Sequence, residues 1–100
     1  MIKLTVLYGH PTDAQVFEDY YKNTHLPKAA LMSGFEKVEY TKFLSAADGG
    51  AAAHYRMAEL WFVDGDALQV TMGSPEGQAT AADLGNFATG GVTLLVGVVE

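Results

Sequence analysis

Four stretches of the chain are rich in β-branched and aromatic residues. In some of them hydrophobic residues alternate with polar ones, and in others both the odd and the even positions are hydrophobic. Such stretches are typical of β-strands, because successive side chains of a strand point to opposite faces of a sheet. Turn-forming residues bound them, as Gly9, His10 and Pro11 do after the first. The predicted strands are Ile2–Tyr8, Phe35–Leu44, His54–Val63 and Val92–Val99.

Helical signals fill much of the sequence between these strands. Thr12 with Gln15 three residues later resembles a capping box, and the pair Ser74 and Pro75 fits the N-cap and first position of another helix. The predicted helices are Asp13 to Thr24 or His25, a short turn at 28–32, Asp66 to Gly73, and Ser74 to about Phe87.

The predicted order of elements is βαββααβ, within a single domain spanning residues 1–100. Two βαβ-like halves in this order favour a ferredoxin-like α+β fold with a four-stranded antiparallel sheet and helices on one face. The second strand, 35–44, carries charge on one side and is expected near an edge of the sheet. Residues 45–53, rich in Ala and Gly, are expected to form a flexible hairpin connection.

The strands at 54–63 and 92–99 are apolar on both faces, although the few helices can cover only one face of the sheet. A second subunit packed sheet against sheet would cover the other face, and most soluble oligomers are closed homo-oligomers. We therefore expect a homodimer.

Composition narrows the functional classes. The chain has 100 residues, a formal net charge of −6 and six Lys and Arg, so a nucleic-acid partner is not expected. It has no cysteine, and no apolar run approaches the roughly 18–20 residues of a membrane span, so a cytoplasmic protein without a membrane partner is expected. His10 and His54 are expected at the far edge of the sheet without a carboxylate, so no metal and no cofactor are predicted.

His25 is the best candidate for chemistry. It follows Phe17 and Tyr21 on one helix face, and Pro27 is expected to end the helix near it. An imidazole can exchange protons near neutral pH, which suits a general acid or base. The alternative is a structural histidine that interacts with the helix C-terminus, and Tyr21 is either a ligand contact or a core residue.

The expected topology assigns partners to His25. If the helix ends at His25, Glu76 at the start of the last helix is the nearest plausible carboxylate, whereas Asp83 and Asn86 lie about 10–15 Å further along. Leu60, Trp61 or Phe62, at the end of the third strand, is expected near His25. Tyr8, Trp61 and Phe87 are core or dimer residues that are also candidates to contact a flat apolar ligand.

Several motifs occur together in order along the chain. They are Lys3–Pro11, Tyr20-Tyr21 with His25-x-Pro27, Ser74–Gln78, and Asp83 followed by Asn86-Phe87. Together they make the sequence resemble the EthD family, named for a protein associated with ethyl tert-butyl ether degradation. The resemblance implies a dimeric α+β barrel, the superfamily fold that also includes muconolactone isomerases and cofactor-free monooxygenases.

The leading hypothesis is a homodimer that binds a small hydrophobic or aromatic metabolite between sheet and helices. By resemblance, the reactions to test are isomerisation, dehydration or cofactor-free oxygenation, with His25 as acid or base. Tyr21, Trp61, Tyr8, Glu76 and Phe87 are the candidate substrate-binding residues. The alternatives are a non-enzymatic accessory binding protein of an oxidative degradation pathway, or a stress-associated dimer without a ligand.

Overall fold

A four-stranded antiparallel sheet runs through the computed structural model, which describes residues 1–100. The strand order is β2-β3-β1-β4, so the first strand of the chain is central. In the sheet, Leu4 lies opposite Leu60 of β3 and Val96 of β4. The strands are β1 (Ile2–Tyr8), β2 (Lys37–Lys42), β3 (Arg56–Phe62) and β4 (Val92–Val98).

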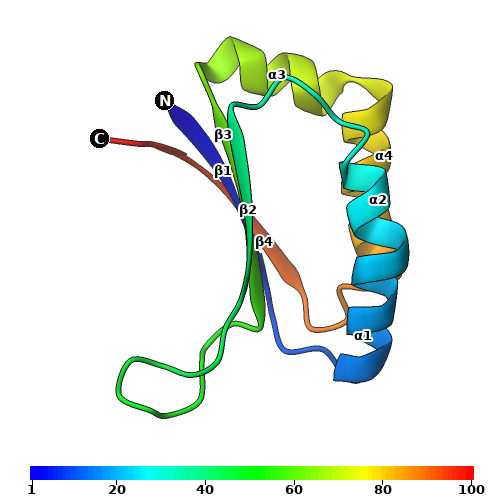
Figure 1. The fold of residues 1–100 in the computed structure, drawn as a ribbon, viewed down its shortest axis with the longest axis vertical. Coiled ribbons are helices and arrows are strands. Elements are labelled where there is room, and N and C mark those ends of the chain that lie inside the picture. The colour runs from blue at the N-terminus through cyan, green and yellow to red at the C-terminus, as the bar shows by residue number, and fades with distance from the viewer.

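All the helices lie on one face of this sheet (Figure 1). Together with the antiparallel sheet they form the expected ferredoxin-like α+β fold. The first helical segment consists of α1 (Ala14–Tyr20), a π-helical turn η1 (Tyr21–His25) and α2 (Leu26–Ala29) in direct succession. The second consists of α3 (Gly65–Gly73), α4 (Pro75–Asp83) and a 3-10 turn η2 (Leu84–Asn86).

The hydrophobic core lies between the sheet and the helices. Alternate residues of the two central strands point into it, for example Leu4 in β1 and Leu60 in β3, because alternate side chains share one face of a strand. The helices contribute aromatic rings, including the stacked pair Phe17 and Tyr21. The β2 strand is an edge strand, as its charged side predicted.

The helix caps agree only partly with the sequence expectation. The N-cap of α1 is Asp13, whose carboxylate accepts the N–H groups of Gln15 and Val16, so Thr12 is not the cap. Ser74 caps α4 as expected, since its Oγ accepts the N–H of Gly77. An oxygen acceptor at each N-cap supplies one of the bonds that the first turn of a helix lacks.

The expectation that Pro27 ends the first helix near His25 is wrong. Leu26 has φ −62° and ψ −40°, and the helix continues to Ala29. The wider π-helical turn precedes the proline, and the Leu26 N–H donates to the carbonyl of Tyr21, five residues back. His25 therefore lies about one turn, or about 6 Å, before the end of the helix.

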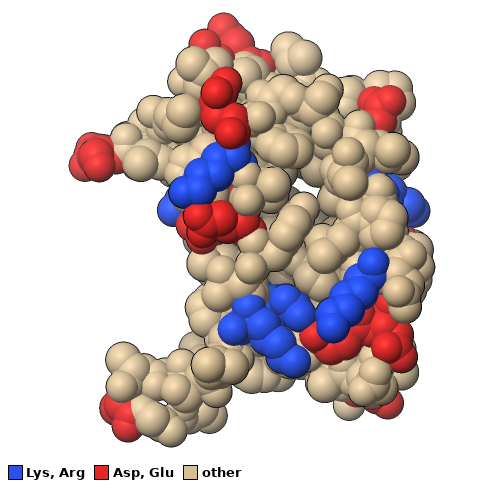
Figure 2. All heavy atoms as spheres, viewed as in Figure 1, with Lys and Arg blue, Asp and Glu red and all other residues tan.

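The face of the sheet opposite the helices is bare. The β2–β3 connection and both chain ends extend past this side, and the face forms a recess between them (Figures 1 and 2). Leu95 is 53% exposed on this side and lies opposite Thr5 of β1.

Several Lys and Arg side chains form ion pairs with Asp or Glu, for example Lys3 with Glu59 at 2.9 Å. Most of the Lys and Arg side chains visible in Figure 2 lie beside an acidic group.

No helix in this structure is both long enough and apolar enough to cross a membrane.

Candidate functional site

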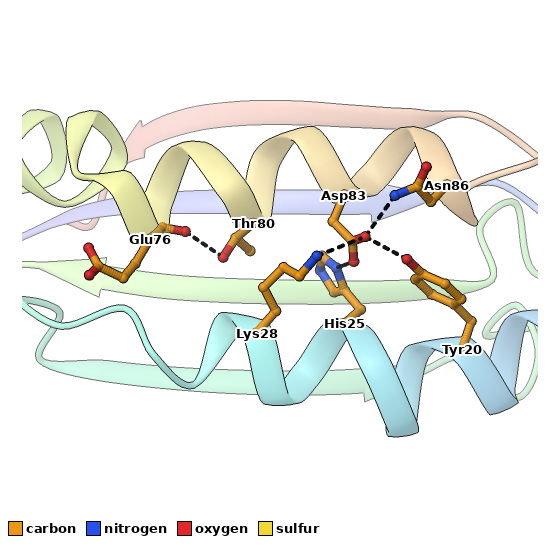
Figure 3. Close-up of polar contacts among 7 residues, drawn as sticks. All are labelled: Tyr20, His25, Lys28, Glu76, Thr80, Asp83 and Asn86. Carbon is orange, nitrogen blue, oxygen red and sulfur yellow. Dashed lines mark hydrogen bonds and ion pairs between the residues drawn. The ribbon is translucent and has the colours of Figure 1, made fainter.

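Asp83, at the end of α4, is the centre of a buried network of side chains (Figure 3). Its Oδ2 accepts a hydrogen bond from Nδ1 of His25 at 2.9 Å. Its Oδ1 accepts from the hydroxyl of Tyr20 at 2.6 Å, from Nδ2 of Asn86 at 2.9 Å and from Nζ of Lys28 at 3.4 Å. Three of the four donors come from the first helical segment, so the network fastens that segment to α4.

The carboxylate of Asp83 is ionised. Burial alone would raise its pKa, but the hydrogen bonds from Tyr20, Asn86, His25 and Lys28 outweigh burial and hold the pKa far below its usual range. An ionised carboxylate only accepts hydrogen bonds, so Nδ1 of His25 must carry a proton and donate it to Asp83.

This bond fixes the tautomer of His25. Burial lowers the pKa of His25 below its ordinary value, and the opposing effect of Asp83 does not fully offset it. The ring is therefore neutral at neutral pH, with its proton on Nδ1. Nε2 has no hydrogen-bond partner in the structure and carries a free lone pair, the form that a general base requires.

Aromatic rings hold the imidazole of His25 in place. The ring of Tyr21 stacks on it with centroids 5.8 Å apart, and the ring of Phe87 lies 4.6 Å away. Tyr8 packs edge-on against Tyr21 at 5.7 Å and next to Phe87 at the same separation. Only 4% of the His25 surface is exposed, so the rings exclude most water from it.

A cavity of about 50 Å³ lies between the sheet and the helices, and His25 forms part of its wall. The wall is mostly apolar, which suits an apolar ligand. Tyr40 of β2 and Leu94 of β4 both line it and are 42% and 44% exposed, so the lining reaches the surface at both edges of the sheet. The other lining residues are Leu4, Val6, Tyr8, Tyr21, Ala29, Met32, Ala58, Leu60, Met72, Thr80, Ala81 and Leu84.

Tyr21 contributes a further polar group without a partner to this wall. The hydroxyl of Tyr21 is buried and has no hydrogen bond, although buried hydroxyls nearly always have one. The guanidinium of Arg56 lies 4.9 Å from the centre of the Tyr21 ring, and two of its nitrogens donate to Glu18 at 2.8 and 2.6 Å. The charge of Arg56 is thus already paired.

The structure brings together four of the six residues expected at the site. His25, Tyr8 and Tyr21 line one cavity, and Phe87 packs on His25 without lining it. Trp61 is not beside His25: it lies on the bare face of the sheet, where Lys37 Nζ is 4.6 Å from its ring centre.

The expectation that Glu76 is the carboxylate nearest His25 is also wrong. Glu76 is exposed and lies seven residues before Asp83, or about 10 Å along α4 (Figure 3). Its side chain makes no hydrogen bond to His25. Its backbone carbonyl accepts a hydrogen bond from the hydroxyl of Thr80. Because the first helix continues beyond Pro27, His25 comes level with Asp83 instead.

Sequence reasoning missed Tyr20 and Lys28 as members of the network. Lys28 lies three residues after His25, a spacing that places two side chains on one helix face, and this was an available signal. Tyr20 gives no such signal, because it is not three or four residues from His25 and its neighbour Tyr21 occupies the face that His25 shares. His10 lies outside the site and contacts the carbonyl of Ala52 at 2.7 Å. No group of three or more His, Asp or Glu side chains is arranged to hold a metal ion.

Comparison with known proteins identifies relatives of this fold and sequence. Residues 9–91 match the family model of the EthD domain. The chain is 35% identical over 95 residues to an uncharacterised 11.0 kDa protein encoded in the thcB-thcC intergenic region of Rhodococcus erythropolis, covering 95% of this chain and 91% of that protein.

Solved structures agree with this result. An ethyl tert-butyl ether degradation (EthD) family protein from Bacillus halodurans is 33% identical, with a TM-score of 0.92, 100% of this chain and 99% of that chain being covered. A dimeric protein of unknown function with a ferredoxin-like fold from Bacteroides fragilis is 16% identical, with a TM-score of 0.67 and coverage of 98% and 95%, and shows the fold alone. From the family model and these relatives, the chain belongs to the EthD family.

Proposed function

We propose that this protein binds a small, uncharged and largely apolar metabolite in the cavity between sheet and helices, and that His25 removes a proton from it. The observation that carries the proposal is the bond between His25 Nδ1 and the ionised Asp83, at the wall of an apolar cavity. This bond leaves Nε2 as a free base in a site from which most water is excluded.

Removal of a proton is the step that the expected reaction classes share. Isomerisation moves a proton from one atom to another, dehydration removes a proton and hydroxide, and cofactor-free oxygenation begins with a deprotonated substrate. When His25 takes up a proton, the ring becomes an imidazolium that Asp83 stabilises across the same hydrogen bond. Asp83 acts through His25 as a positioning residue.

The proposal includes a homodimer formed through the bare face of the sheet. The exposed Leu95 and the half-buried Trp61 lie on this face, and no helix of the same chain covers them. A second copy packed sheet to sheet would bury them. The dimeric ferredoxin-like protein from Bacteroides fragilis supports this arrangement by its description and fold.

Titration with 2-propanol, followed by NMR, tests the binding site. 2-Propanol is small enough for a cavity of about 50 Å³, is mostly apolar, and carries a hydroxyl proton that it can donate to Nε2 of His25. We expect chemical shifts to change at Leu60 and Leu94, which line the cavity, and to stay constant at Leu95 on the opposite face. Changes confined to Leu95 and its neighbours would place binding elsewhere and contradict the proposal.

Replacement of His25 separates an enzyme from a binding protein. The variant His25→Ala is expected to keep its fold and to lose any turnover of a substrate found by screening. An accessory binding protein would instead lose affinity in this variant without any reaction ever being detected in the wild type. A stress-associated dimer without a ligand would show no binding to the cavity in either protein.

A further inference from the structure

The hydroxyl of Tyr21 is a buried hydrogen-bond donor that the protein leaves unused. A buried hydroxyl without a partner destabilises a protein unless a ligand or water supplies the missing bond. Tyr21 is 1% exposed and forms part of the cavity wall next to His25. The unused donor and the free Nε2 therefore belong to side chains that line the same space.

The cavity wall also restricts the charge of a ligand. None of its residues is Lys, Arg, Asp or Glu, so a charged ligand would lose its hydration without gaining a counter-charge. Burial raises the pKa of Tyr21 well above its ordinary value, so its phenol stays protonated and can donate. The wall thus offers Nε2 of His25 as a base and the Tyr21 hydroxyl as the donor beside it, and the hydroxyls of Tyr8 and Tyr40 belong to the same wall.

We propose that Tyr21 donates a hydrogen bond to the oxygen of an uncharged aldehyde or ketone, from whose α-carbon His25 removes a proton. This inference rests on the proposed function and specifies its substrate class. In the step, the α C–H bond breaks and its electron pair forms a carbon–carbon double bond. The carbonyl π pair moves to the oxygen, and the proton goes to Nε2 of His25.

The developing negative charge on the oxygen falls where the Tyr21 hydroxyl donates. Hydrogen bonds at a developing oxyanion strengthen in the transition state, so they speed the reaction as well as aid binding. The positive charge of Arg56, 4.9 Å from the ring centre, acts in the same direction by partly offsetting the rise in the pKa of Tyr21. The proton returns from His25 to carbon in the product.

The size of the cavity selects a short substrate or a short end of a longer one. A water-sized group needs roughly 10–15 Å³ on this measure, so about 50 Å³ holds about four such groups. A longer chain could leave past Leu94, which lines the cavity and is 44% exposed. A four-carbon ketone is a suitable probe.

Two probes of matched shape test the hydrogen bond. In 2-methyl-1-butene, a CH₂ group replaces the carbonyl oxygen of 2-butanone. NMR titration should show both in the cavity, with 2-butanone bound about 3–10-fold more tightly. The preference should disappear in Tyr21→Phe and persist in Tyr55→Phe, because Tyr55 also has a buried hydroxyl but does not line the cavity. Tyr21→Phe keeps the ring and removes only an unpaired group, so it should fold.

Exchange of the α-hydrogens of 2-butanone for deuterium in D₂O tests the proton transfer. Wild type and Tyr55→Phe should accelerate exchange, Tyr21→Phe should accelerate it about 100-fold less, and His25→Ala should not accelerate it. Equal binding of the two probes to wild type would overturn the inference while leaving the proposed cavity site intact. Binding of neither probe would overturn both. Preferential binding of 2-butanone without accelerated exchange would contradict the proton transfer.

Discussion

At the scale of single residues, the site depends on a carboxylate that is buried yet ionised. Four side chains donate to Asp83, and only their combined hydrogen bonds outweigh the penalty of burying its charge. The protonation state of His25 follows from that arrangement, because an ionised acceptor at Nδ1 leaves Nε2 as the base. Chemistry at His25 therefore depends on residues that do not touch the cavity themselves.

The variant Asp83→Asn should be less stable by about 1.5–3 kcal/mol, because hydrogen bonds to a charged group are lost and buried donors lose their acceptor. It should also lower the pKa of His25 further, since Asp83 raises that pKa in the wild type. Urea unfolding and an NMR titration measure the two effects. Asp66→Asn, at an exposed carboxylate of α3, is the control and should change stability by less than about 0.5 kcal/mol. Equal stabilities of the two variants would mean that the Asp83 network contributes little.

Glu18 should make the protein sensitive to acid. Its hydrogen bonds from Arg56 lower its pKa from the ordinary 4.5 to about 2, although burial opposes this. A carboxyl with a lowered pKa in the folded state stabilises the fold fully above its unfolded pKa, so this contribution should be lost as the pH falls from about 4.5 towards 2. Thermal unfolding at several pH values measures it. Glu18→Gln should be less stable at neutral pH and show a shallower decline, whereas Glu39→Gln, at the exposed Lys37–Glu39 pair, should decline as the wild type does.

At the scale of elements, the axial position of the first helical segment decides which carboxylate His25 meets. The π-helical turn Tyr21–His25 lets the helix pass Pro27 and continue to Ala29. Strand positions and the Ser74 cap could be predicted, because alternation and N-cap chemistry are local signals. The pairing of His25 with Asp83 could not, because Pro27 reads as a helix end and nothing local in the sequence marks a π-helical turn.

The contact between α3 and α4 should depend on Gly77. A Cβ at this position would overlap the carbonyl oxygen of Thr71 and the Cα of Met72. Gly77→Ala should therefore force the helices apart and cost about 1–3 kcal/mol, as overpacking in a close contact does. Gly85→Ala is a matched control, since a Cβ there meets nothing within 4 Å. Chemical denaturation compares them, and a Gly77→Ala variant as stable as Gly85→Ala would refute the close approach of the two helices.

At the scale of the whole molecule, the single layer of helices covers one face of the sheet and leaves the other face bare. The order of elements was enough to predict the ferredoxin-like fold. The apolar character of both faces of β3 and β4 predicts that a second subunit covers the bare face, and this stays a prediction. Of the three residues expected near His25, Leu60 lines the cavity with it, whereas Trp61 does not, because alternation assigns Leu60 and Trp61 to opposite faces and Leu60 faces the helices.

Leu95→Glu should weaken the proposed dimer, because it places a charge on the bare face, on the edge strand β4 opposite Thr5 of β1. Sedimentation velocity at micromolar concentration should show a dimer for the wild type and a larger fraction of monomer for the variant. Val70→Glu, at a 74% exposed position on the helix side, should sediment as the wild type does. A folded wild-type protein that sediments as a monomer would contradict the dimer.

The protonation state of His25 is the most direct test of the proposed base. Long-range ¹⁵N–¹H correlation of the histidine rings near pH 7, with His25 assigned by its absence in His25→Gln, should show a neutral ring protonated at Nδ1 and unprotonated at Nε2. The pKa of His25 should lie below about 6.5. A ring protonated at Nε2 with Nδ1 free, or a pKa above about 6.5, would contradict the account.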